Sequence, residues 1–341
     1  MELTRSRIHK GIIFSVGVSI LTIVSVIFYT QDELTPSIFS KIEPEFLVLA
    51  VLITMIFWNI KALKLKIMAK ALGSSVSYRK VFAIFMASAF VSHVTPSSSG
   101  GLPFAIYFLH REGLSLGQST ALTVLENMLT LTFFMLLSPV ILFLSGDFLN
   151  LAPAISNLFY ITVFLLSIII FVLVILIFNS YLASKFINWL TGLNWIKALF
   201  SEKKLKFFRG YMEEEVYLFR EGMSVILAQK KDFVMILIST VIYWCFYLSL
   251  APVLLLGLGI NVSLPPVIMA QIILKFILPI IPTPGSSGGA ELGFAYLFKF
   301  LIPNYFLGIF VALWRFFMFY FSLIIGGIYF ISLVRGTRYI E

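Results

Sequence analysis

The sequence predicts an all-α integral membrane protein that crosses the bilayer several times, and two observations lead to this fold class. Of its 341 residues, 60% are hydrophobic and only 12% are charged, whereas a soluble domain carries about 25% charged residues. Apolar runs long enough for a helix to cross a bilayer also recur along the chain. Such runs exclude an outer-membrane β-barrel, whose strands alternate apolar and polar residues. The composition also argues against nucleic-acid binding, despite the net charge of +9.

Six segments are predicted to cross the membrane completely. They are Gly11–Thr30, Phe46–Ile60, Gln118–Leu144, Ala152–Phe178, Phe233–Ile260 and Tyr305–Val334. The second of them is short for a crossing helix. We expect it to span the bilayer because Lys61 and Lys64 extend from its end toward the interface.

Two further apolar stretches, Val81–Leu109 and Leu264–Ile302, are interrupted by Pro, Gly and Ser. Each predicts a re-entrant hairpin, in which a helix enters the membrane, breaks near the midplane and is followed by a second helix that returns to the same side. With these hairpins and a cytoplasmic N-terminus, 21 of the 25 Lys and Arg residues lie on cytoplasmic segments. This asymmetry is the one expected from the positive-inside rule. We therefore expect a multi-pass plasma-membrane protein with both termini in the cytoplasm.

Residues 181–231 form the only long polar stretch of the chain. Aromatic and aliphatic residues alternate there with Lys, Arg and Glu at helical spacing. This pattern predicts a cytoplasmic amphipathic helical segment that lies on the membrane surface, and a lipid-sensing or partner-docking role is the alternative.

A short motif occurs twice in the chain, as TPSSSGG at residues 95–101 and TPGSSGG at residues 283–289. Six of the seven positions are identical, at an offset of 188 residues. The flanking segments follow at nearly the same offset, which gives a first repeat over 46–145 and a second over 233–334. Because the two hairpins open on opposite sides in the predicted topology, the repeats are inverted. Inverted repeats with broken helices at the midplane are typical of transporters.

The two breaks predict a binding site for an anion. The half-helices that begin at Gly101 and Gly289 would direct the positive ends of their dipoles toward a shared cavity. Serine hydroxyls add hydrogen-bond donors, and glycine lets a ligand approach the backbone. Close helix packing through small residues is the alternative. The candidate binding residues in the breaks are Thr95, Pro96, Ser98, Ser99, Gly100, Gly101, Thr283, Pro284, Ser286, Ser287, Gly288 and Gly289.

Charged side chains inside the apolar segments complete the predicted binding site. They are Glu126, Lys275, Glu291 and Arg315, and each should pair or line a hydrated cavity because a charge at mid-bilayer costs about 2.5–3.5 kcal/mol. Glu126 and Arg315 occupy equivalent repeat positions to within one residue. They are therefore expected to meet or to bind the two ends of a zwitterionic headgroup, and a purely structural salt bridge is the alternative. His93, Glu126 and Glu291 are candidates for proton coupling, with a structural role as the alternative for the histidine.

Several of these motifs together resemble a known family. These motifs are the stretch TPSSSGGLPFAIYFL from Thr95 to Leu109, the Glu126 that follows, PTPGSSGGAELGF from Pro282 to Phe294 and the pair Trp314–Arg315. Together they are similar to the lysylphosphatidylglycerol synthetase transmembrane region, also called the flippase-like or UPF0104 family. The resemblance covers roughly residues 10–335. It implies the membrane half of a bifunctional bacterial protein that moves aminoacylated phosphatidylglycerol between leaflets. Because the sequence ends at Glu341, we expect a stand-alone form without the aminoacyl-transferase domain.

We therefore expect a lipid flippase or scramblase and not an enzyme. Its expected partners are membrane lipids, namely anionic or zwitterionic phospholipids, aminoacylated phosphatidylglycerol or polyprenyl-linked lipids, and a second copy of the chain in a homodimer. The sequence contains no Walker A, HExxH or GxSxG motif, so neither a metal nor a cofactor is expected. A secondary transporter for a small soluble anion is the main alternative. An intramembrane transferase with Glu126 or Glu291 as its acid or base is a further one.

Overall fold

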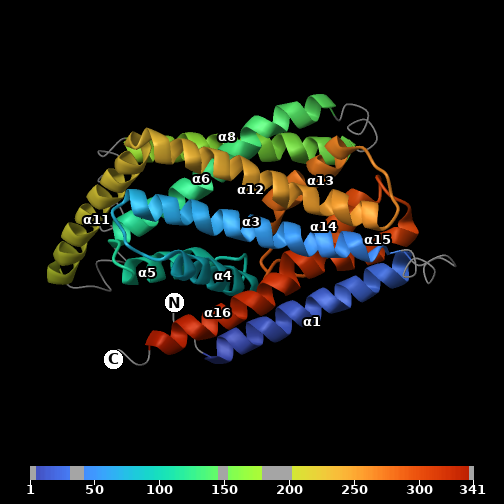
Figure 1. Ribbon diagram of the computed structural model, residues 1–341, viewed down its shortest axis with the longest axis horizontal. Coiled ribbons are helices and arrows are strands. Elements are labelled where there is room, and N and C mark those ends of the chain that lie inside the picture. Colours follow the sequence, from blue (N-terminus) through green and yellow to red (C-terminus); the bar gives the residue numbers. More distant parts are fainter. Residues whose placement is uncertain (1–4, 31–41, 145–152, 179–201, 338–341) are drawn as a thin grey trace.

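The computed structural model describes residues 5–30, 42–144, 153–178 and 202–337. In this part of the chain the structure is a bundle of helices without strands, and most of the long helices run along the long axis of the bundle (Figure 1). Five helical segments are long and apolar enough to cross a membrane: His9–Thr30, Pro44–Ala71, Leu116–Leu144, Lys230–Gly257 and Asn304–Arg335. The predicted class, an all-α multi-pass membrane protein, is therefore confirmed.

Each of the six predicted spans coincides with a helix or with a run of consecutive helices. In chain order the helices are α1 (Arg5–Thr30), α3 (Pro44–Ala71), α4 (Tyr78–Val94), α5 (Gly101–Arg111), α6 (Leu116–Leu144), α8 (Pro153–Phe178), α11 (Glu202–Ala228), α12 (Lys230–Gly257), α13 (Leu264–Ile277), the 3₁₀ turn η2 (Leu278–Ile280), α14 (Gly289–Phe298), α15 (Asn304–Arg315), the π turn η3 (Phe316–Tyr320) and α16 (Phe321–Thr337).

Helices α3 and α12 form the centre of the bundle and run antiparallel along their whole length (Figure 1). At one end, the side-chain amide of Gln229 donates a hydrogen bond to the carbonyl of Ala71, at 2.9 Å. At the other end, the backbone N–H of Glu43 donates to the carbonyl of Gly257, at 3.0 Å. We call the end at which α3 ends and α12 begins the α11 end, because α11 covers it (Figure 1).

The two interrupted segments each form a helical hairpin, and the hairpins enter the bundle from opposite ends. Lys80 at the start of α4 contacts Glu112 just after α5, at 2.8 Å, so the first hairpin opens at the α11 end. The second hairpin, α13 and α14, lies in the chain between the end of α12 and the start of α15. It therefore opens at the opposite end of the bundle.

The breaks at the tips of the two hairpins have the same backbone conformation. Ser97 and Ser98 have φ angles of 51° and 54°, and their counterparts 188 residues later, Gly285 and Ser286, have φ angles of 59° and 55°. These left-handed conformations are uncommon for residues other than glycine. The breaks are thus special turns that the two copies of the motif share, and not merely gaps between helices.

The two breaks also contact each other. Pro96 and Pro284 form an isolated antiparallel bridge, and these two prolines are equivalent positions of the repeated motif. A residue that pairs antiparallel with its own counterpart lies next to an axis of approximate two-fold symmetry. The tips of the two hairpins consequently meet inside the bundle.

Gly285 shows how tightly the second break is packed. A Cβ atom at this position would lie 2.5 Å from the ring of Phe319 and 2.8 Å from the carbonyl of His93. We expect Gly285→Ala to lower the free energy of unfolding by about 2–4 kcal/mol, the combined cost of a left-handed alanine and of overpacking. Gly259→Ala is the matched control, because Gly259 has a φ of +72° but no atom within 4 Å of its added Cβ. Equal losses for both variants in a denaturant titration in detergent would contradict this packing.

Two of the predicted spans differ from the structure in detail. Helix α3 continues well beyond the predicted end at Ile60, to Ala71, because two lysines in this extension share a carboxylate inside the bundle, as described below. The last predicted span is helical throughout, but it contains the π turn η3 directly after Arg315. Such π turns are frequently found at functional sites.

The amphipathic segment predicted over 181–231 is a helix where the structure describes it, in α11. Residues 179–201 lie outside the described part. The last turns of α11 bury Met223 and Ile226, and the carboxylate of Glu215 accepts a hydrogen bond from the backbone N–H of Gly117, at 2.5 Å. This helix therefore packs on the start of α6.

Candidate functional site

A cavity of about 460 Å³ lies where the two breaks meet. Ser98 of the first break and Gly285 and Ser286 of the second contribute to its wall. From there the cavity extends toward the α11 end, where Val81 and Leu109 line it. Its volume is within the range of small-ligand sites, which is about 300–1,000 Å³.

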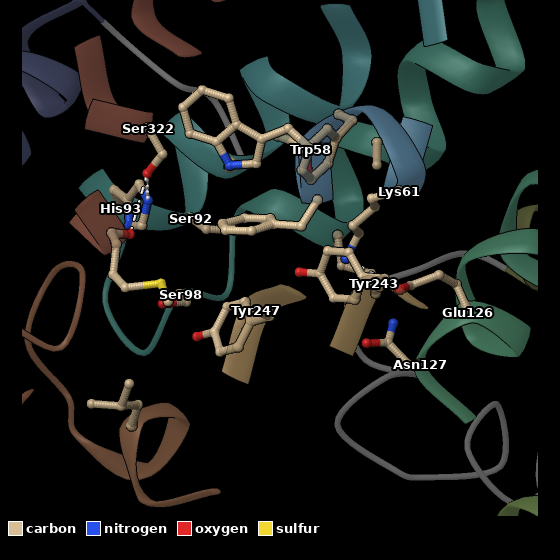
Figure 2. A pocket seen from close by; sticks show the side chains of 18 of the residues that line it. Trp58, Lys61, Ser92, His93, Ser98, Glu126, Asn127, Tyr243, Tyr247 and Ser322 are labelled. Atoms are coloured by element: carbon tan, nitrogen blue, oxygen red, sulfur yellow. Dashed lines mark hydrogen bonds and ion pairs between the residues drawn. The ribbon is translucent and has the colours of Figure 1, made fainter. Parts of the chain in front are cut away.

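One carboxylate in this cavity is shared by two lysines. Glu126 on α6 lies 3.1 Å from the Nζ atom of Lys61 and 3.2 Å from that of Lys64, and Figure 2 shows Lys61 and Glu126 meeting beside Tyr243. The Lys64 side chain is fully buried, and its ammonium group also contacts the hydroxyl of Thr240, at 3.4 Å. Two positive charges thus share one negative charge.

The prediction that Lys61 and Lys64 extend to the membrane interface is therefore wrong. A buried lysine is stable only if a carboxylate or other polar groups compensate its charge. Glu126 provides that compensation from another helix.

A second buried ion pair joins α14 to α15. The Nε atom of Arg315 lies 2.8 Å from the carboxylate of Glu291, and both side chains are at most 4% exposed. The guanidinium also donates to the hydroxyl of Ser287, at 2.9 Å, and to the carbonyl of Gly285, at 3.0 Å. From α1, the hydroxyl of Ser19 donates to Glu291. This network fixes the second break against two neighbouring helices.

Glu291 also occupies the N-terminus of the second half-helix. Its carboxylate accepts a hydrogen bond from the backbone N–H of Gly288, at 2.7 Å, and so caps α14 from within. Glu291 thus satisfies one N–H group at this helix end itself, and binding of an anion at Gly289 stays a prediction.

The predicted contact between Glu126 and Arg315 is also wrong. Each has its own partner, Lys61 and Lys64 for the glutamate and Glu291 for the arginine. Both side chains nevertheless line the same cavity. Equivalent positions in the sequence bring them to one chamber, but not into contact.

Most hydroxyls of the two breaks hold the breaks together through hydrogen bonds to nearby backbone carbonyls. The Thr95 hydroxyl accepts from the N–H of Gly100, at 3.0 Å, and donates to the carbonyl of Val91, at 2.8 Å. The remaining bonds run from Ser99 to the carbonyl of Pro96, from Thr283 to that of Ser287 and from Ser286 to that of Leu278. Ser98 is different, because it lines the cavity and makes no side-chain hydrogen bond to the described residues.

Gly101, at the start of the first half-helix, is required by close packing. A Cβ atom there would lie 1.9 Å from the hydroxyl oxygen of Ser92 and 2.7 Å from the carbonyl of Ser88. The glycine thus lets α5 pack directly against α4, as in the small-residue packing that was the alternative to an anion site.

His93 lies at the end of α4 and lines the cavity. Its Nε2 atom is 2.6 Å from the hydroxyl of Ser322 on α16 (Figure 2). Its ring packs edge-on against Phe319. Its role in proton coupling remains a prediction, as it does for the two glutamates.

Lys275, at the end of α13, is the predicted charged residue with the most open surroundings. It lines the cavity and has neither a carboxylate nor a hydrogen-bond partner among the described residues. Its ammonium group lies 5.5 Å from the ring centre of Trp244 and 5.8 Å from that of Tyr247. These cation–π contacts stabilise the charged form without using its hydrogen-bond donors.

Sequence reasoning missed several residues of this site. Tyr243 and Tyr247 lie one turn apart on α12 and both line the cavity (Figure 2); their helical spacing is the one signal that could have paired them. Ser92 also lines the cavity. Ser19 is one of several serines in the apolar helix α1, and nothing in the sequence distinguishes it from the others.

Comparison with known proteins agrees with this picture. Residues 12–326 match the model of the lysylphosphatidylglycerol synthase TM region. The chain is 30% identical over 322 residues to a UPF0104 membrane protein of Archaeoglobus fulgidus, which covers 93% of this chain and 94% of that protein. It is 26% identical over 144 residues to a UPF0104 membrane protein of Methanocaldococcus jannaschii, or 42% of each chain. No solved structure matches.

The match to the family model covers nearly the whole bundle, including both breaks and the four charged residues predicted for the site. The resemblance expected from the repeated motif is thereby confirmed. The chain belongs to the family of the lysylphosphatidylglycerol synthase transmembrane region, together with the UPF0104 membrane proteins.

Proposed function

We propose that this protein moves lipids between the two leaflets of its membrane. The headgroup passes through the charged cavity while the acyl chains stay in the surrounding lipid. One observation carries the proposal: an apolar groove lies directly beside the cavity. The Trp58 side chain lines both of them.

The groove runs between α3, α4 and α16 and has a volume of about 460 Å³. Its lining is mostly apolar and includes Met55, Phe82 and Ile328. Met55 is 48% exposed and Ile328 is 60% exposed, so the groove faces the surroundings of the bundle. In a membrane these surroundings are acyl chains. A chamber for a headgroup next to a groove for a chain fits a lipid better than a small soluble anion.

The arrangement of the hairpins supports an inverted repeat with two gates. The hairpins open at opposite ends, and their tips meet at Pro96 and Pro284. In a transporter of this type the two related halves close the same site in turn from opposite sides. The cavity extends toward the α11 end, and we propose that this end faces the cytoplasm because most Lys and Arg residues lie on segments at that side.

An aromatic cluster packs α14 against α15, and one of its rings, Trp314, lines the cavity. The rings of Phe294, Phe298, Phe310 and Trp314 form this cluster, with centroids 4.3–5.0 Å apart. We propose that the site is reached from the α11 end in this state, because the cavity extends to Val81 and Leu109. The description of the family, which names a lipid-synthesising protein, further supports a lipid substrate. We propose transport, and not catalysis, as the role of this chain.

A bulky residue inside the cavity tests this function. Ala105 lines the cavity from α5, and the indole ring of Ala105→Trp should occupy part of the open volume and obstruct the passage of a headgroup. In proteoliposomes, acyl-labelled fluorescent phospholipids are quenched from outside, with and without an imposed proton gradient. We expect wild type to accelerate the loss of inner-leaflet signal and Ala105→Trp to slow it by about tenfold or more.

Val241→Trp is the matched control, because Val241 is 48% exposed on α12 and does not line the cavity. It should exchange lipids as fast as wild type. If folded wild-type protein accelerates no lipid under either condition, the proposed function is wrong. If Ala105→Trp and Val241→Trp behave alike, lipids do not move through this cavity.

A further inference from the structure

The ion pairs around the cavity leave an excess of positive charge. Arg315 and Glu291 neutralise each other. Glu126 is shared by Lys61 and Lys64, which leaves one positive charge at that cluster. No other carboxylate among the described residues lines the cavity.

Lys275 adds a second uncompensated positive charge. It lies in the last turn of α13, where the negative end of the helix dipole stabilises a cation. The aromatic rings under its ammonium group stabilise the charge further. Neither interaction uses an N–H donor of the ammonium group, so these donors stay available to a ligand.

Neutral donors surround the same space. The hydroxyls of Ser92, Ser98, Tyr243 and Tyr247 belong to residues that line the cavity, and none of them makes a side-chain hydrogen bond to the described residues. Figure 2 shows the Tyr247 hydroxyl pointing into the open space on the side of Ser98. A phosphate offers several strong acceptor oxygens for such donors.

From this charge balance we infer that the cavity selects a lipid whose headgroup carries about two negative charges, which is a phosphomonoester or a diphosphate diester. The inference rests on the proposed function and names its substrate class. A phosphomonoester carries about −1.5 to −2 at pH 7 and matches the two uncompensated lysine charges. A zwitterionic headgroup leaves both of them unmatched. A cationic aminoacylated headgroup adds a like charge in a poorly hydrated site, which is strongly unfavourable.

The experiment compares four acyl-labelled lipids in the same proteoliposomes: phosphatidic acid, phosphatidylglycerol, phosphatidylcholine and lysylphosphatidylglycerol. We expect phosphatidic acid to exchange about tenfold or more faster than phosphatidylcholine, with the lysylated lipid slowest. Lys275→Gln should lower the rate for phosphatidic acid about tenfold and that for phosphatidylcholine much less, so that the preference between the two lipids largely disappears. Lys275→Arg, which keeps the charge, should keep the preference.

Lys299→Gln is the matched control. Lys299 also lies over aromatic rings, 4.3 Å from the centre of Tyr296 and 4.9 Å from that of Phe300, but it does not line the cavity. Lys299→Gln should leave every exchange rate unchanged.

A thermal-unfolding assay in detergent distinguishes a lipid ligand from a soluble phosphate. Dioctanoyl phosphatidic acid should raise the unfolding temperature of wild type. The same lipid should not raise that of Lys275→Gln, and glycerol 3-phosphate should not raise that of wild type.

Equal rates for phosphatidic acid and phosphatidylcholine, or a faster rate for the lysylated lipid, would overturn the inference while the proposed lipid transport stands. A preference that survives Lys275→Gln undiminished would also overturn it. If no lipid moves at all, it is the proposed function that fails.

Discussion

Replacing Glu126 by glutamine is expected to lower the free energy of unfolding by about 3–5 kcal/mol, because removal of one partner from a buried ion pair leaves an uncompensated charge. Here two ammonium groups lose their carboxylate at once, at 3.1 and 3.2 Å. The Lys64 side chain is fully buried, so it cannot turn toward water. A denaturant titration in detergent, followed by tryptophan fluorescence, measures the loss.

An exposed ion pair of the same chemistry provides the control for Glu126→Gln. Lys80 and Glu112 are 2.8 Å apart, but their side chains are 58% and 21% exposed. Glu112→Gln should therefore cost only about 0–1 kcal/mol. If Glu126→Gln costs no more than Glu112→Gln, the shared carboxylate does not stabilise the lysines as described.

The second large effect is expected at Glu291 and Arg315. Each single substitution, Glu291→Leu or Arg315→Met, should cost about 3–5 kcal/mol because the other side chain stays buried and charged. The double variant removes both charges and should cost clearly less than the sum of the two. We expect a coupling energy of about 3 kcal/mol in this double-mutant cycle.

Ser19 allows the cycle to be extended to α1. Its hydroxyl donates to Glu291 and lies 3.3 Å from the Nε atom of Arg315. Ser19→Ala should cost about 1–2 kcal/mol in wild type and almost nothing in the double variant. Additive losses throughout the cycle would mean that these three side chains do not act as one network.

The features that sequence could predict are local ones. The breaks were visible because glycine, proline and serine interrupt apolar runs, and the offset of 188 residues connected them. The left-handed turns at Ser98 and Ser286 were not part of this prediction, because serine rarely adopts that conformation. A local pattern that occurs twice is therefore sufficient to locate both hairpins.

The ion pairs were not predictable, because each depends on a partner distant in the chain. Lys64 and Glu126 are 62 residues apart, and hydropathy alone treats a lysine at the end of an apolar run as a residue at the interface. Only the packing of α3 against α6 and α12 shows that it lies inside. Sequence reasoning consequently made α3 too short.

The contribution of α1 was invisible for a similar reason. In the sequence it is an ordinary apolar helix, yet a Cβ atom on Gly11 would lie 2.3 Å from the carbonyl of Val94 at the end of α4. Ser19 contacts the ion pair beside the other break. Helix α1 thus packs across both hairpin tips. Which face of an apolar helix is buried can be decided only by its neighbours.

The most direct test of this account compares a lipid with its headgroup alone in the same proteoliposomes. Vesicles containing wild-type protein are assayed for leaflet exchange of labelled phosphatidic acid and for uptake of radiolabelled glycerol 3-phosphate, with Ala105→Trp as the blocked control. We predict accelerated exchange of the lipid, its loss in the blocked variant, and no uptake of the solute above that of empty vesicles. Uptake of glycerol 3-phosphate without lipid exchange would show that the cavity serves a soluble anion, and would contradict the central claim.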